Sequence, residues 1–126
     1  MRFMVFVPGN AESEAGGLPP QELVDQMNRY NDELAKAGVL VALDGLRPTS
    51  HGAKVRFEGG RRTVTDGPFT EAKELVAGFW ILECKSKEEA IEWVKRAPFD
   101  GGVEIEVREI FDSADFEAEM QAKARA

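Results

Sequence analysis

The chain has 126 residues, of which 16 are basic and 23 acidic, giving a formal net charge of −7. An acidic surface repels polyanions, which argues against nucleic acid and anionic membranes as partners. The one cysteine excludes an internal disulfide. No apolar run approaches the roughly 18 residues of a membrane span, and the amino terminus lacks the pattern of a secretory signal, so we expect a cytoplasmic protein.

The first third of the chain predicts a strand, a helix and a second strand. Residues 3–7 form an apolar run typical of a buried strand, and the small, polar residues 11–17 predict a flexible loop. Pro19 and Pro20 precede a helix that Gly38 ends, in the position of a left-handed C-cap. The apolar stripe of this helix is Leu23, Met27, Tyr30, Leu34 and Ala37. Residues 39–43 predict the second strand.

The remaining elements begin with a hairpin. Residues 53–58 alternate, Gly59-Gly60 turns the chain and residues 62–65 return. Residues 75–83 predict a strand that is apolar on both faces. Ser86, with a glutamate three residues later, indicates a capping box for a helix that ends at Pro98. Residues 103–107 predict a strand with one wet face, and Ser113 is a candidate cap for a C-terminal helix.

This order predicts an α+β fold, namely a ferredoxin-like βαββαβ unit with an inserted β-hairpin. We expect a single domain over residues 1–126, with a core at 1–111 and a short helical tail at 112–126. Two helices cover only one face of a four-stranded sheet, yet residues 3–7 and 75–82 are apolar on both faces. We therefore expect two copies to pack their sheets face to face as a homodimer with two-fold symmetry.

Known metal, nucleotide and nucleophile motifs are absent from the sequence. One histidine and one cysteine argue against a zinc site, and there is no P-loop, dinucleotide glycine motif or GxSxG elbow. We therefore expect no metal and no cofactor. Cys84 follows an apolar run and is interpreted as a buried strand residue rather than a catalytic thiol. Tyr30 and Trp80 fit core positions better than a pocket wall.

The nonapeptide DGPFTEAKE, from Asp66 to Glu74, is the densest group of reactive side chains. Its charged members are Asp66, Glu71, Lys73 and Glu74. Gly67 and Pro68 predict a tight turn, and Phe69 is expected to tuck beneath the domain. A lysine among carboxylates can hold one of them ionised while another exchanges protons. The same residues also fit a capped turn with surface ion pairs of about 0–1 kcal/mol each, the interpretation favoured on chemistry alone.

Two residues upstream are candidates to join this nonapeptide. His51 follows Pro48 in a polar loop and could pair with Asp66 for proton transfer near neutral pH, although a solvated histidine is the commoner case. Arg47 could bind an anionic ligand or form an ion pair with Asp44, and we favour the ion pair.

VTDGPFTEAKE, with GVLVALDGLRPTS upstream and GFWILECKSKEEAIEWVKRAPF downstream, resembles the DGPF-motif branch of the YCII-related proteins over about residues 1–111. The matching positions are Asp66, Gly67, Pro68, Phe69, Glu71, Lys73 and Glu74, flanked by Gly45, Leu46, Pro48 and Gly78. The resemblance implies a dimeric α/β-barrel and small bacterial proteins of mostly unassigned role, some associated with extracytoplasmic-function sigma factors. A His–Asp pair is proposed for the wider group, but Met27 stands near the position that its helical histidine would take.

Two functional hypotheses follow from these observations. The favoured one is a small-molecule-binding or regulatory module, acting as a homodimer, in which the nonapeptide is a structural turn. The alternative is a cofactor-free enzyme of the isomerase or lyase type, and it predicts a cleft beside the DGPF turn. In that alternative Asp66 is the general base or its orienting partner, Lys73 an electrostatic stabiliser and Glu74 a second acid–base group. DNA binding is disfavoured because the chain is acidic and has no basic recognition helix.

Overall fold

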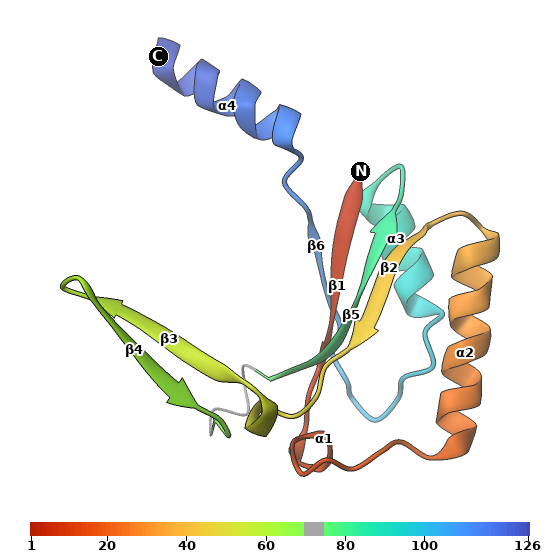
Figure 1. Cartoon of the computed structure of the whole chain (residues 1–126). Coiled ribbons are helices and arrows are strands. Elements are labelled where there is room, and N and C mark those ends of the chain that lie inside the picture. The colour runs from red at the N-terminus through yellow and green to blue at the C-terminus, as the bar shows by residue number, and fades with distance from the viewer. Residues whose placement is uncertain (70–74) are drawn as a thin grey trace.

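A four-stranded antiparallel sheet with strand order β2-β5-β1-β6 forms the centre of the molecule (Figure 1). The computed structural model describes residues 1–69 and 75–126. The strands are β1 (Arg2–Pro8), β2 (Leu40–Gly45), β5 (Val76–Glu83) and β6 (Glu106–Glu109). Helices α2 (Gln21–Lys36) and α3 (Lys87–Lys95) cover one face of this sheet, so the predicted ferredoxin-like α+β fold is confirmed.

The core lies between the sheet and the two helices. Side chains of a strand alternate between its faces, so every second residue of β1 and β5 points toward the helices. Phe3 pairs with Leu82, and Val5 pairs with Trp80, on this covered face. Leu34 of α2 packs on them and, like Phe3, is fully buried.

The polar groups of the core have partners. The Tyr30 hydroxyl donates a hydrogen bond of 2.6 Å to the carbonyl oxygen of Trp93, and burial raises its pKa to about 12. The Trp80 indole donates a hydrogen bond of 2.8 Å to Asn31 Oδ1. Burial also raises the pKa of the Cys84 thiol. Tyr30, Trp80 and Cys84 are therefore core residues, as the sequence predicts.

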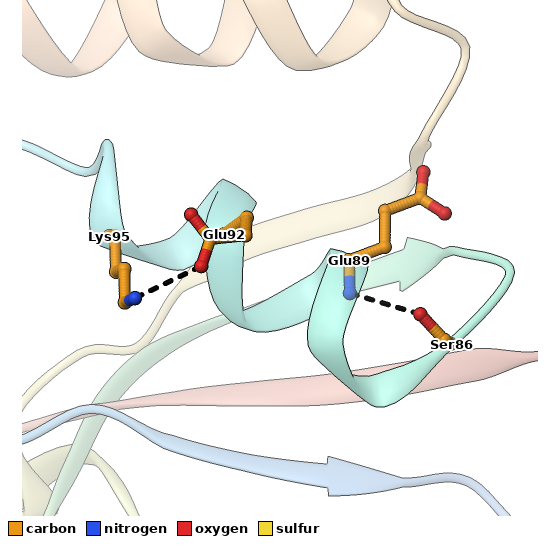
Figure 2. A network of polar contacts seen from close by, with 4 residues as sticks. All are labelled: Ser86, Glu89, Glu92 and Lys95. Carbon is orange, nitrogen blue, oxygen red and sulfur yellow. Dashed lines mark hydrogen bonds and ion pairs between the residues drawn. The ribbon is translucent and has the colours of Figure 1, made fainter.

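The predicted helix ends are largely as expected. Gly38 has a φ of 74° just beyond α2, the left-handed conformation that favours glycine. Ser86 Oγ accepts the backbone N–H of Glu89 at 3.1 Å, as Figure 2 shows. The Glu89 carboxylate accepts the N–H of Lys85 rather than that of Ser86, so only half of the predicted capping box forms.

Two segments differ from the sequence prediction near the ends of the chain. Residues expected to be a loop contain a one-turn helix, α1 (Ala11–Glu14). Asn10 and Ser13 exchange side-chain-to-backbone hydrogen bonds of 2.8 and 2.9 Å, a capping box that was missed because one turn shows no apolar periodicity. The C-terminal helix α4 (Ser113–Arg125) is capped by the side chain of Asp112 rather than by Ser113.

The strand predicted over residues 103–107 is displaced along the chain. Strand β6 begins at Glu106, and its Val107 pairs with Val5. Because Gly101 and Gly102 both have positive φ values, the turn after α3 extends further before the chain joins the sheet. The expected alternation survives, since Val107 points toward the helices while Glu106 and Arg108 lie on the other face.

Two elements project from the sheet on the side away from α2 and α3 (Figure 1). One is the predicted hairpin of β3 (Ala53–Glu58) and β4 (Arg61–Asp66). Gly59 and Gly60 have φ values of 54° and 81°, which fits a two-residue turn with both central residues at positive φ. The other is α4. A short helical turn, η1 (Thr49–His51), leads from β2 into the hairpin.

The sheet face opposite the helices has an apolar centre, which we call the open face. It consists of two cross-strand pairs of half-buried residues, Met4 with Ile81 and Phe6 with Phe79. Neither α2 nor α3 reaches it (Figure 1). The expectation that β1 and β5 are apolar on both faces is therefore met, with only one of those faces covered by helices within the chain.

Candidate functional site

The DGPF turn begins at the end of β4 and lies against η1. The backbone N–H of Gly67 donates a 2.9 Å hydrogen bond to the carbonyl oxygen of Gly52. Two residues later, the N–H of Phe69 donates a 2.9 Å hydrogen bond to Thr49 Oγ1. The segment after β2 and the DGPF turn, 20 residues apart in sequence at this contact, thus form one local structure.

Glu14 connects this structure to the N-terminal part of the chain. Its two carboxylate oxygens accept hydrogen bonds from the backbone N–H and the hydroxyl of Thr49, at 2.8 and 2.6 Å. These bonds favour the charged carboxylate and lower the pKa of Glu14. Thr49 therefore joins α1 to the DGPF turn, because its hydroxyl donates to Glu14 and accepts from Phe69.

Two glycines of the family motifs stand where the backbone approaches another segment closely. A Cβ atom on Gly67 would overlap the carbonyl oxygen of Thr49 and lie 2.6 Å from its carbonyl carbon. A Cβ atom on Gly78 would lie 2.9 Å from the carbonyl oxygen of Asp44. Both positions require glycine for packing, which gives the motif a structural role independent of any chemistry.

The candidate acid–base residues Asp66 and His51 lie at the same end of the hairpin. Asp66 is the last residue of β4 and pairs with Ala53, and His51 ends η1. Both are exposed. Within residues 1–69 and 75–126, no hydrogen bond or ion pair joins them. Glu71, Lys73 and Glu74 lie outside the described residues.

The other predicted site residues are placed around the turn. Phe69 is half-buried, with the Lys54 ammonium 4.5 Å above its ring, so it is only partly tucked beneath the domain. Pro68 is exposed and joined to Gly67 by a cis peptide bond. Arg47 is exposed as well. Among the described residues no ion pair joins Arg47 to Asp44, and Arg47 follows the end of β2 at Gly45.

A cavity of about 580 Å³ lies beside the start of β5, where β1 and β6 meet; we call it the edge groove. Its lining residues are Phe6, Pro8, Leu75, Val76, Glu104, Ile105, Glu106 and Arg108. Leu75 follows the nonapeptide directly, and its carbonyl oxygen accepts a 3.0 Å hydrogen bond from the N–H of Gly9. The groove thus includes Leu75, the residue that follows the nonapeptide in sequence, and Phe6 of the open face.

The lining of the edge groove contains both apolar and charged residues. Phe6 and Ile105 are half-buried, whereas Glu104, Glu106 and Arg108 are exposed. Arg108 Nε lies 3.6 Å from a carboxylate oxygen of Glu106, and the long, exposed pair is too weak to hold either side chain in place. Such a groove offers a surface for a flat apolar molecule and a guanidinium for an oxygen substituent.

Sequence reasoning missed Glu14, Thr49 and the groove residues of β6. The side chains that meet at Thr49 are 35 and 20 residues apart in sequence, and no local pattern reports contacts of that range. Within residues 1–69 and 75–126, no cluster of three or more His, Cys, Asp or Glu side chains is placed to bind a metal ion. None of the helices described in those ranges is long and apolar enough to cross a bilayer.

The fold and the motif segments together define a class of small α+β proteins, and comparison with known proteins identifies the family. Residues 1–114 match the YCII-related domain, so the chain belongs to the YCII-related family. It is 31% identical over 75 residues to an uncharacterised protein of Rhizobium meliloti (strain 1021). That match covers 60% of this chain and 60% of the length of the curated relative.

The fold is also similar to that of a solved enzyme structure. This is 5-chloro-2-hydroxyhydroquinone dehydrochlorinase from Burkholderia phenoliruptrix AC1100, in complex with 2,5-dihydroxybenzoquinone. The TM-score is 0.51 with 16% sequence identity, and the similarity covers 90% of this chain and 97% of the enzyme chain. Because the sequence identity is only 16%, the similarity concerns the fold alone.

Proposed function

We propose that this chain is a small-molecule-binding module of the DGPF-motif branch, acting in the cytoplasm as a homodimer. The observation that carries the proposal is the edge groove, a cavity of about 580 Å³ beside the start of β5. Its lining combines apolar residues with the Arg108 guanidinium and the carboxylates of Glu104 and Glu106, and apolar walls with a few polar groups are usual in a site for a small organic ligand.

The proposed dimer follows from the open face. Met4, Phe6, Phe79 and Ile81 form a continuous apolar surface in the middle of the sheet. An antiparallel sheet with one face in water normally alternates apolar and polar residues, whereas this sheet is apolar on both faces at its centre. A second copy supplies the same surface and covers it symmetrically. Because Phe6 belongs to both the open face and the groove, the second copy also closes one side of the groove.

The proposed ligand class is a small, flat ring compound with oxygen substituents. The half-buried Phe6 offers a surface against which a ring can lie, and Arg108 offers charged N–H donors to its oxygens. A protein of the same fold is known in complex with 2,5-dihydroxybenzoquinone, which makes this compound a suitable first probe.

The geometry of the motif favours a binding module over an enzyme. Gly67 serves backbone packing, and Thr49 holds the turn through two hydrogen bonds that use no ligand. The alternative remains a cofactor-free enzyme in which Asp66, His51, Lys73 and Glu74 exchange protons with the bound molecule. It differs from the module in predicting turnover of the bound molecule.

The proposal is tested by calorimetric titration of the full chain with 2,5-dihydroxybenzoquinone. Replacing Arg108→Gln removes a charge-assisted hydrogen bond, so we expect affinity to fall by about tenfold or more. The matched control, Arg29→Gln on the exposed surface of α2, leaves affinity unchanged. Equal binding by the wild type and Arg108→Gln would exclude the groove as the site. Conversion of the compound that Asp66→Asn abolishes would instead favour the enzyme.

A further inference from the structure

The two projecting elements, the β3–β4 hairpin and α4, have no buried residue between them. Phe57 of the hairpin is 68% exposed, and Phe116 of α4 is 51% exposed. A lone two-stranded hairpin is marginally stable in water, and so is an isolated 13-residue helix. Each element would therefore be stabilised by a surface that residues 1–69 and 75–126 of its own chain do not supply.

Both elements carry an apolar face of matching size. On the hairpin, Val55 lies opposite Val64, and Phe57 lies opposite Arg62 on the same face. The Arg62 guanidinium is 4.6 Å from the Phe57 ring. On α4, Phe116 and Met120 are one turn apart and share a stripe.

A third aromatic residue extends the stripe of α4 toward the sheet. The Phe111 ring lies 5.3 Å from the Phe116 ring in an edge-to-face arrangement, with 78° between the ring planes. Phe111, Phe116 and Met120 are all at least half exposed. They form one apolar strip that begins beyond β6 and continues along the helix.

The two elements differ in charge, and on the hairpin Arg62 is the basic residue that shares the apolar face, while Lys54, Arg56 and Arg61 lie on its other face. Although the chain has a net charge of −7, residues 53–66 contain four basic side chains against two acidic ones. The basic residues are Lys54, Arg56, Arg61 and Arg62. Residues 112–119 contain four acidic side chains and no basic one, namely Asp112, Asp115, Glu117 and Glu119. Contact between the two apolar faces would bring Arg62 onto an acidic helix.

Within one chain the two elements leave from opposite ends of the sheet. The N–H of Ile110, just before α4, donates to the carbonyl oxygen of Arg2 at the start of β1. The hairpin precedes β5, whose Val76 pairs with Pro8 at the end of β1. If two sheets face each other across a two-fold axis that runs perpendicular to the strands, the strands of the two copies run in opposite directions. The α4 end of one sheet then lies over the hairpin end of the other, so each α4 meets the hairpin of the second copy.

We propose that α4 of one copy docks on the apolar face of the β3–β4 hairpin of a second copy, and that each dimer contains this contact twice. The proposal rests on the homodimer proposed above. Phe116 and Met120 pack on Val55, Phe57 and Val64, while Glu117 or Glu119 pairs with Arg62. This contact would explain why the two elements that project from the sheet carry exposed apolar side chains.

Cysteine trapping between two differently tagged full chains tests this contact. One chain carries Phe57→Cys, the other Met120→Cys, and both carry Cys84→Ala so that no other thiol is present. We expect mild oxidation to link the two chains into a mixed dimer. The control replaces Met120→Cys by Arg29→Cys on α2, on the far side of the sheet, and should not link. A further variant carries both cysteines in one chain. If it forms only a disulfide within that chain and no linked dimer, the proposed contact between copies is wrong.

Charge reversal provides a second, independent test. Arg62→Glu and Glu119→Lys should each raise the dimer dissociation constant about three- to tenfold at low salt, and the double variant should recover most of that loss. If all three variants keep the wild-type dissociation constant and no cysteine link forms, the sheets pair without contact between α4 and the hairpin of the second copy. A wild-type chain that is monomeric would instead refute the proposed homodimer itself. The inference would also be wrong if the hairpin bound another acidic macromolecule and made no contact with α4 of a second copy.

Discussion

The two faces of the central sheet differ in what covers them, although the same strands supply both. Along β5, Trp80 and Leu82 are buried beneath α2 and α3, while Phe79 and Ile81 are only half-buried on the open face. Alternate residues of one apolar run thus have different surroundings. The difference shows that α2 and α3 cover one face of the sheet, and the proposed homodimer assigns the cover of the other face to a second copy.

The largest expected effect comes from one substitution on each face. The two losses in free energy of unfolding should depend differently on protein concentration. Leu34→Ala leaves a cavity in the covered core, and we expect it to lower the free energy of unfolding by about 2–5 kcal/mol at every concentration. Ile81→Ala removes contact mainly between copies, so its cost should grow with concentration as the dimer becomes populated. Urea unfolding at two protein concentrations measures both.

Two outcomes would contradict these expectations. If Ile81→Ala costs as much as Leu34→Ala and the cost is independent of concentration, then the open face is covered within the chain. If neither cost exceeds about 1 kcal/mol, the core assignment itself is wrong.

A smaller effect is expected at the DGPF turn. Gly67→Ala places a methyl group on the Thr49 carbonyl, so the turn must shift, and we expect a loss of about 1–3 kcal/mol in the free energy of unfolding. Gly45→Ala is the matched control, because its Cβ would meet its nearest neighbour at an ordinary 3.9 Å. Thermal denaturation of the two variants gives the difference, and equal melting temperatures would argue against close packing of the motif.

The smallest effect concerns Glu14 and pH. Its pKa is lowered in the folded state by the two hydrogen bonds from Thr49. The stabilisation is therefore present above the ordinary glutamate pKa of 4.5 and is lost as the pH falls through the lower folded-state value. Glu14→Gln should remove this part of the acid dependence. Chemical denaturation from pH 3 to 7 would show parallel curves for the two proteins if the interaction contributes nothing.

The sequence predicted the elements that carry a strong local pattern. Alternating residues located the hairpin, a step of three and four located α2, and Gly38 marked its end. The nonapeptide was recognised as a motif, but its contacts were not. Glu14 reaches Thr49 from a one-turn helix, and the groove residues come from a strand whose start was displaced to Glu106. Such contacts depend on how distant segments pack, and local periodicity carries no information about that.

Sedimentation equilibrium of the full chain is the most direct test of the central claim, that the open face pairs two copies and closes the edge groove. We predict a dimer at micromolar concentration, and a monomer with unchanged circular dichroism for Phe79→Glu, because a buried charge without a partner disrupts the interface. Asp32→Lys, a charge change on the exposed side of α2, should remain dimeric. A monomeric wild type, or a Phe79→Glu variant that dimerises as tightly as the wild type, would contradict the claim.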